Sequence, residues 1–132
     1  MVAWAKNYIG IPFVSNGRTR EGCDCYGLCR LVLQEEYHAV LPALSGDYEN
    51  ALDVKETAAL FAENRPVLLA APLSEPEEGC VVIITERGRP CHLGIYAGSG
   101  YILHTTAKTG SVAQRISHPD LAGRIEGYYR VR

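Results

Sequence analysis

The residues with the clearest chemical potential lie in the stretch Gly22-Cys23-Asp24-Cys25-Tyr26-Gly27-Leu28, where a polar loop runs into an apolar-periodic segment. Asp24 suits a helix N-cap, because its carboxylate can accept a hydrogen bond from a free amide of the first helical turn. Cys25 would then lie in that turn, where the unpaired N–H groups and the positive end of the helix dipole favour an anion. We therefore expect the pKa of Cys25 to fall from about 8.5 to roughly 4–7, which makes the thiol a nucleophile at neutral pH. The alternative is a small buried thiol, since free cysteines are among the most buried residues.

Two histidines form a second candidate group in the later half of the chain. Residues 91–97 alternate in polarity, so His92 and Gly94 share one face of the expected strand. If Gly98-Ser99-Gly100 is the loop of a hairpin, Gly94 lies opposite His104, and His92 lies one diagonal step away at roughly 7–8 Å. Gly94 has no side chain, which leaves room for the two rings to lean together. A shift of one residue in the register would turn His104 away.

These side chains match the needs of a cysteine hydrolase. Such an enzyme uses a thiolate, an imidazole that protonates the leaving group, and a third polar group that holds the imidazole in one tautomer. Cys25, His92 and His104 can fill those roles in that order. For each histidine alone the simpler interpretation is a satisfied strand residue. His38 and His118 have no comparable setting, and we expect both at the surface.

A helix over residues 25–37 would position the thiol. The apolar side chains at positions 25, 28, 29 and 32 have helical spacing and form one face, while residues 34–36 mark the wet side. The face that carries Cys25 is thus the buried one, at the edge of the core. A short helix over residues 2–9, ended by Gly10, and a loop over residues 13–21 precede it.

The remaining chain predicts an insert and then a sheet. The signal is weak over about residues 38–72, which we interpret as a variable helical insert with one helix over residues 54–63. Apolar or alternating runs bounded by turn residues then predict strands over residues 80–84, 91–97, 101–106, 112–116 and 125–131.

Composition sets outer limits on the function. The 132 residues, 47% of them hydrophobic, are enough for one domain over residues 1–132 with its own core. The net charge of −2, from 13 basic and 15 acidic residues scattered along the chain, gives no electrostatic case for binding nucleic acid or an anionic membrane. Five cysteines cannot all pair within one chain, so we expect reduced thiols. Lys6 and Asn7 interrupt any signal-peptide core, and no apolar run approaches a membrane span.

The motifs, taken in order, resemble those of the NlpC-type cell-wall endopeptidases, papain-like cysteine peptidases that cut bacterial peptidoglycan stem peptides. The likeness rests on residues 24–28, on His92-Leu93-Gly94-Ile95-Tyr96 and on His104, and it covers most of the chain outside the insert. The Cys25-Tyr26-Gly27-Leu28 form, the insert with Leu41-Pro42 and the ending at residues 125–130 look most like the phage-tail branch. That branch includes the tail assembly proteins of lambda-like phages and prophages.

The resemblance implies a fold, a mechanism and partners. The fold is α+β, with N-terminal helices and the Cys helix packed on an antiparallel sheet that carries the histidines. Cys25 is the nucleophile, His92 the general base and acid, and His104 the group that orients His92. The bond cut lies between D-glutamate and a diamino acid, the Cys25 N–H is one oxyanion donor, and no cofactor or metal is involved. The implied partners are the stem peptide and other tail proteins, with action on the wall as part of a tail or after lysis.

Several residues depart from the family pattern. Phe13 stands where many members have a Tyr whose hydroxyl assists the oxyanion, and loss of one such donor can cost ~10²–10³ in rate. Ser15 or Asn16 would have to substitute for it. Tyr26 replaces the commoner Ser, and Cys80 replaces an Asp that often begins the first strand.

Two alternatives stay open. A zinc-binding module would draw four ligands from Cys23, Cys25, Cys29, Cys91 and His92, although the usual paired spacing of zinc ligands is absent. A structural tail subunit would keep the fold with little or no activity, and Phe13 favours this reading.

Overall fold

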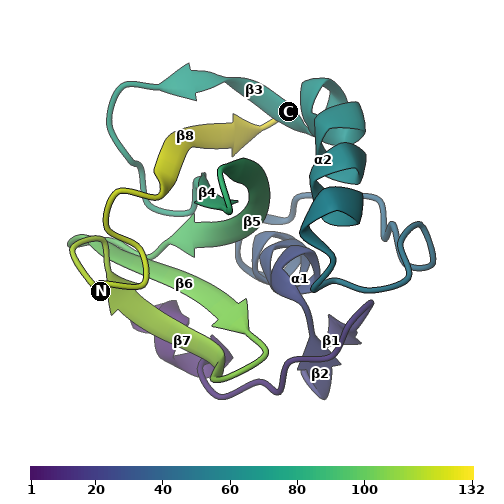
Figure 1. Ribbon diagram of the computed structural model, residues 1–132. Helices are drawn as coiled ribbons and strands as arrows, with labels where there is room; N and C mark the ends of the chain where they lie inside the picture. The colour runs from purple at the N-terminus through teal and green to yellow at the C-terminus, as the bar shows by residue number, and fades with distance from the viewer.

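Two α-helices and a six-stranded antiparallel sheet form most of the structure (Figure 1). The computed structural model describes residues 1–132. Its elements follow in the order η1 (Ala3–Tyr8, a 3₁₀-helix), β1 (Arg18–Thr19), β2 (Gly22–Cys23), α1 (Cys25–Tyr37), α2 (Val54–Leu68), β3 (Leu69–Leu73), β4 (Val81–Glu86), β5 (Arg89–Tyr96), β6 (Tyr101–Thr106), β7 (Gly110–Arg115) and β8 (Ile125–Val131).

The sheet has the strand order β3-β8-β4-β5-β6-β7, with every neighbouring pair antiparallel. The last strand, yellow in Figure 1, therefore lies inside the sheet between β3 and β4. The expected bounds are exact for β6 and β8 and differ by up to two residues for β4, β5 and β7. The α+β architecture expected from the sequence, with N-terminal helices on an antiparallel sheet, is confirmed.

Both faces of the sheet are apolar, and α1 covers one of them. Leu28 and Val32 of α1 belong to a buried cluster that also holds Leu93 of β5 and Leu103 of β6. Neighbouring residues of β4 and β6 point the other way, into a smaller cluster around Leu121. This alternation gives successive strand residues opposite surroundings. Neither helix is long and apolar enough to cross a membrane.

Helix α1 has the expected bounds because both of its ends are capped. The Asp24 carboxylate accepts a 2.9 Å hydrogen bond from the Gly27 N–H. At the other end His38 adopts a left-handed conformation, with φ of 56°, and its N–H donates to the Leu33 carbonyl. Gly27 is required for packing, because a Cβ there would lie 2.0 Å from the Gly17 carbonyl oxygen.

The insert is more regular than the sequence suggests. Helix α2 continues five residues beyond the expected end and holds Pro66 in its last turn. Its buried side chains are Phe61 and Leu68. Strand β3 follows directly, although the sequence analysis predicts no strand there. Its Pro72 is tolerated because β3 is an edge strand, paired only with β8.

The β5–β6 hairpin has the register on which the histidine prediction depends. The Ala97 N–H donates to the Tyr101 carbonyl at 2.8 Å, and Ile95 pairs with Leu103. Gly94 therefore lies opposite His104. A Cβ at Gly94 would lie 2.7 Å from a methyl carbon of Ile102, so the position has no room for a side chain. The paired ladder between β5 and β6 ends at Ile95, just before the two histidines.

Candidate active site

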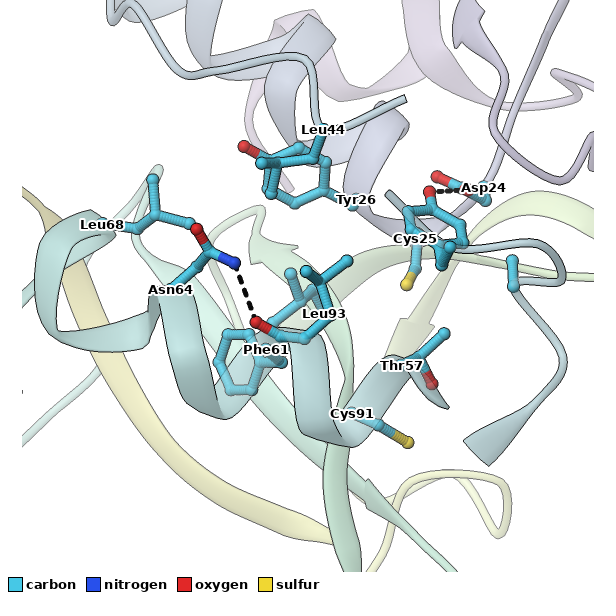
Figure 2. Close-up of a pocket in the computed structure, with 13 residues that line it drawn as sticks. Asp24, Cys25, Tyr26, Leu44, Thr57, Phe61, Asn64, Leu68, Cys91 and Leu93 are labelled. Carbon is cyan, nitrogen blue, oxygen red and sulfur yellow. Dashed lines mark hydrogen bonds between the residues drawn. The ribbon is translucent and has the colours of Figure 1, made fainter. Parts of the chain in front are cut away.

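Cys25 is the first residue of α1 and is half-buried. Its sulfur lies against β5, where the backbone N–H of Leu93 donates to it, as does the N–H of Tyr26. Figure 2 shows the sulfur directed into a hollow that Leu93, Thr57 and Cys91 also line. The helix start thus delivers the thiol to the strand that carries His92.

The resting thiol is protonated at neutral pH. Burial raises the pKa of Cys25 to about 12, and the adjacent Asp24 carboxylate adds to the rise, while the N–H groups of Leu93 and Tyr26 oppose it. The expectation of a lowered pKa is therefore wrong for the free protein. Loss of water around the sulfur and one neighbouring negative charge outweigh the favourable helix end.

The two histidine side chains are in direct contact. His92 Nε2 lies 3.0 Å from His104 Nδ1, and the rings meet edge to face with centroids 5.3 Å apart. Both side chains are buried. The structure thus brings together the two imidazoles that the hairpin register placed on one face.

Gln114 extends this contact into a relay that fixes the tautomers. His104 Nε2 lies 2.6 Å from the Gln114 Oε1, and the Gln114 Nε2 donates to Asp120 Oδ2 at 3.2 Å. Because an amide oxygen only accepts, His104 donates from Nε2 and its Nδ1 accepts. His92 then donates from Nε2, which leaves its Nδ1 unprotonated and without a partner in the protein.

The histidines are uncharged at neutral pH. Burial lowers the pKa of His92 to about 3, with further lowering by His104 and by Arg124. Burial also lowers the pKa of His104, against the opposing effect of its hydrogen bond with Gln114. The resting site therefore contains a neutral thiol and a neutral imidazole, a pair suited to general-base catalysis.

Gln114 is a functional candidate that the sequence reasoning missed. It lies on β7, and the ladder pairs it with Ile102, two residues before His104. The alternation within residues 112–116 was the available signal, since it gives Gln114 the same sheet face as Ile102 and His104. Without the β6–β7 register, the alternation does not show that Gln114 lies near His104.

Asp24 is the centre of a buried cluster that connects the insert to helix α1. Besides the Gly27 N–H, its carboxylate accepts hydrogen bonds from the Asn16 N–H at 2.8 Å, from Arg18 at 2.9 Å and from the Tyr48 hydroxyl. Arg18 also donates to the Tyr48 oxygen at 2.7 Å. Asp24 therefore has a positioning role and is not free to bind a ligand.

Ser15 and Asn16 bind the insert. Ser15 Oγ accepts from the Ala51 N–H at 2.7 Å. The Asn16 amide donates to the Tyr48 carbonyl and accepts from the Gly46 N–H. Both side chains thus hold the loop before α2.

The other sequence candidates lie around the thiol. Phe13 lines a hollow with Cys25 and His92. Tyr26 packs against the main core cluster, and its hydroxyl donates to the Pro42 carbonyl at 2.6 Å. Tyr26 therefore holds down the start of the insert.

Two hollows meet at Cys25. One is mainly apolar and lies between α1 and the insert, with Tyr26, Leu44, Phe61 and Leu93 among its walls (Figure 2). The other has mixed polarity and reaches His92 and β6.

The zinc alternative has no support in the structure. All five cysteines are unpaired, and no group of three or more His, Cys, Asp or Glu side chains is placed to hold a metal ion. Cys91 and His92 face opposite sides of β5, which separates two of the proposed ligands.

Comparison with known proteins decides the family. The model of the NlpC/P60 family matches residues 10–126. This chain belongs to the NlpC/P60 family. Members of the NlpC/P60 family are typically cysteine peptidoglycan hydrolases. The resemblance inferred from the motifs is thus confirmed at the level of the family.

Solved structures show the same NlpC/P60 fold. The NlpC/P60 domain of the peptidoglycan hydrolase SagA has a TM-score of 0.57 and 21% identity, over 86% of this chain and 85% of that one. An NlpC/P60 family protein from Bacillus cereus has a TM-score of 0.66 and 17% identity, over 96% of this chain but 37% of that one. A lipoprotein-like NLP/P60 protein from Staphylococcus aureus has a TM-score of 0.63 and 20% identity, over 96% and 38%. No curated protein sequence matches the chain.

Proposed function

We propose that this NlpC/P60 protein hydrolyses an amide bond of peptidoglycan stem peptides, with Cys25 as nucleophile and His92 as general base and acid. One observation carries the proposal. The relay from Gln114 through His104 leaves the Nδ1 of His92 unprotonated, and His92 lines the same hollow as the Cys25 thiol. A buried base that lines the same hollow as a half-buried thiol suits nucleophilic catalysis.

The chemical steps follow from these protonation states. As the Cys25 sulfur attacks the substrate carbonyl, its proton moves to His92 Nδ1. The imidazolium then protonates the departing amine, which breaks the C–N bond and leaves a thioester on Cys25. His92, neutral again, takes a proton from water, whose oxygen attacks the thioester and releases the acid and the free thiol.

The helix start and the relay would stabilise the charges that develop. The Cys25 N–H lies in the first turn of α1, where no intrahelical acceptor exists, and it is available to the oxyanion. When His92 is an imidazolium, His104 Nδ1 accepts a hydrogen bond from its Nε2–H and so stabilises the positive charge. Gln114 in turn accepts from His104 Nε2 and donates to Asp120.

The proposed bond is that between D-glutamate and a diamino acid, and the proposed setting is a phage or prophage tail acting on the cell wall, either in the particle or after lysis. The support is the resemblance of residues 25–28, of the insert and of residues 125–130 to the phage-tail branch. On this proposal the partners are the stem peptide and other tail proteins. Immunodetection of the protein in purified particles, against the lysate, tests the setting.

A structural subunit with little activity is the second candidate. Phe13 favours it, because its ring lines the hollow with Cys25 yet carries no hydroxyl for the oxyanion. Turnover of a defined γ-D-glutamyl-diamino acid peptide separates the two functions. We expect release of the diamino acid by the native protein and by Cys80→Ala, whose thiol lines neither hollow, and none by Cys25→Ala. Equal, negligible turnover by all three proteins would favour the structural role.

A further inference from the structure

One buried hydroxyl in the structure has no hydrogen-bond partner. Thr105, on β6, is fully buried, and its Oγ1 is the one side-chain nitrogen or oxygen atom closed off from solvent that has no hydrogen-bond partner. Buried polar groups are nearly always hydrogen-bonded, because an unpaired one loses its hydrogen bonds to water and gains none in the protein. The unpaired hydroxyl of Thr105 is therefore unusual for a native structure.

Thr105 lies where β5 and β6 diverge. The register that pairs Ile95 with Leu103 places Thr105 opposite Leu93, but the ladder has already ended. The Leu93 N–H, which would otherwise face β6, donates to the Cys25 sulfur. Thr105 and Cys25 both line the hollow that contains His92.

The other hydroxyls of that hollow are already bonded within the protein. Thr57 Oγ1 donates to the Asp53 carbonyl at 2.9 Å, and Thr106 Oγ1 lies 2.7 Å from Thr109 Oγ1. Phe13, which also lines the hollow, has no hydroxyl. Thr105 is therefore the one side-chain hydroxyl near the nucleophile that is uncommitted.

We propose that Thr105 is a substrate-binding residue, whose hydroxyl donates a hydrogen bond to the carbonyl oxygen that Cys25 attacks. This inference rests on the proposed hydrolase function. Thr105 and the Cys25 N–H then hold the same oxygen from two sides as its negative charge develops. The partner that the free protein lacks is supplied by the substrate.

The role predicts opposite effects on stability and on activity. Thr105→Val keeps the shape of the side chain and removes only an unpaired hydroxyl, so the melting temperature stays unchanged or rises. The same variant loses a donor to the oxyanion, so kcat falls about 10²-fold with little change in KM. Thr105→Ser keeps the hydroxyl and restores most of kcat.

Thr85→Val is the matched control. Its hydroxyl donates to the Arg124 carbonyl at 3.3 Å and lies outside both hollows, so this variant should lower the melting temperature and leave kcat unchanged. If Thr105→Val keeps the native kcat, or loses activity only in proportion to a lowered melting temperature, the inference is wrong.

Binding of a stem-peptide aldehyde gives a second readout that needs no turnover. The Cys25 sulfur adds to the aldehyde carbon, and the thiol proton passes to the oxygen, which then occupies the oxyanion position. We expect Thr105→Val to weaken this binding by about tenfold or more, and Thr105→Ser to preserve it. Weakened binding supports Thr105 even where hydrolysis is undetectable and the proposed function fails; equal binding, or none by the native protein, overturns the role of Thr105.

Discussion

His92 and His104 are joined through His92 Nε2 and His104 Nδ1 at 3.0 Å. In this contact the Nε2–H of His92 donates to His104, so the Nδ1 of His92 carries no proton and can act as a base. Since Gln114 in turn fixes the tautomer of His104, the basic nitrogen of His92 depends on a residue two strands away. The tautomer of His92 thus depends on the pairing of β6 with β7 as well as on the β5–β6 hairpin.

Removal of the Gln114 amide tests the relay. In Gln114→Leu the His104 Nε2–H loses its acceptor, so we expect the free energy of unfolding to fall by about 1–3 kcal/mol. The kcat should also fall, because His104 can then adopt the other tautomer and stop accepting from His92. Urea titration and steady-state kinetics measure both effects. Gln34→Leu, on the exposed side of α1, should change neither; native kcat in Gln114→Leu would refute the relay.

The pH dependence of alkylation tests the protonation state of Cys25. With the pKa of Cys25 raised to about 12, the thiolate fraction grows tenfold for each pH unit between pH 7 and 10. The rate of iodoacetamide labelling at Cys25 should follow this slope with no plateau. Cys25 should still react faster than the four other cysteines, because they are buried. A plateau beginning below pH 7 would show an activated thiolate instead.

Stability should fall as the pH drops below about 6.5. The folded pKa of His92 is lowered to about 3, so between these values the unfolded chain binds more protons than the folded one. Each pH unit that the pH falls within that window should lower the free energy of unfolding by up to about 1.4 kcal/mol through His92. His92→Gln should flatten the slope measured by urea unfolding between pH 4.5 and 7.5. An unchanged slope in His92→Gln would contradict the lowered pKa.

Tyr48 should couple the insert to helix α1. Tyr48→Phe removes the hydroxyl between Asp24 and Arg18, and a hydrogen bond to a charged group is worth about 1.5–3 kcal/mol. We expect that loss in the free energy of unfolding, together with a raised KM, since Tyr48 also walls the apolar hollow. Tyr101→Phe, on β6 and outside both hollows, provides the comparison. Equal stability of the two variants would remove the proposed coupling.

Local patterns predicted the parts of the site that depend on short-range geometry. The cap at Asp24 and the bounds of α1 follow from helical spacing, and the contact of His92 with His104 follows from a three-residue hairpin loop. Strand β3 was missed because its pairing with β8 joins distant segments. Gln114 and Thr105 gain their settings only when β5, β6 and β7 are assembled. The pKa of Cys25 was predicted in the wrong direction, because burial is a tertiary property that helix position does not reveal.

Mass spectrometry of an acid-quenched reaction tests the central claim most directly. A stem peptide is mixed with the native protein or with Cys25→Ala at neutral pH, quenched within milliseconds to seconds, and the protein is digested and mapped. Our account predicts an acyl group from the amino-terminal part of the substrate, held as a hydroxylamine-sensitive thioester on Cys25 and missing from the variant. Turnover by Cys25→Ala, or an acyl group on a different side chain, would contradict it.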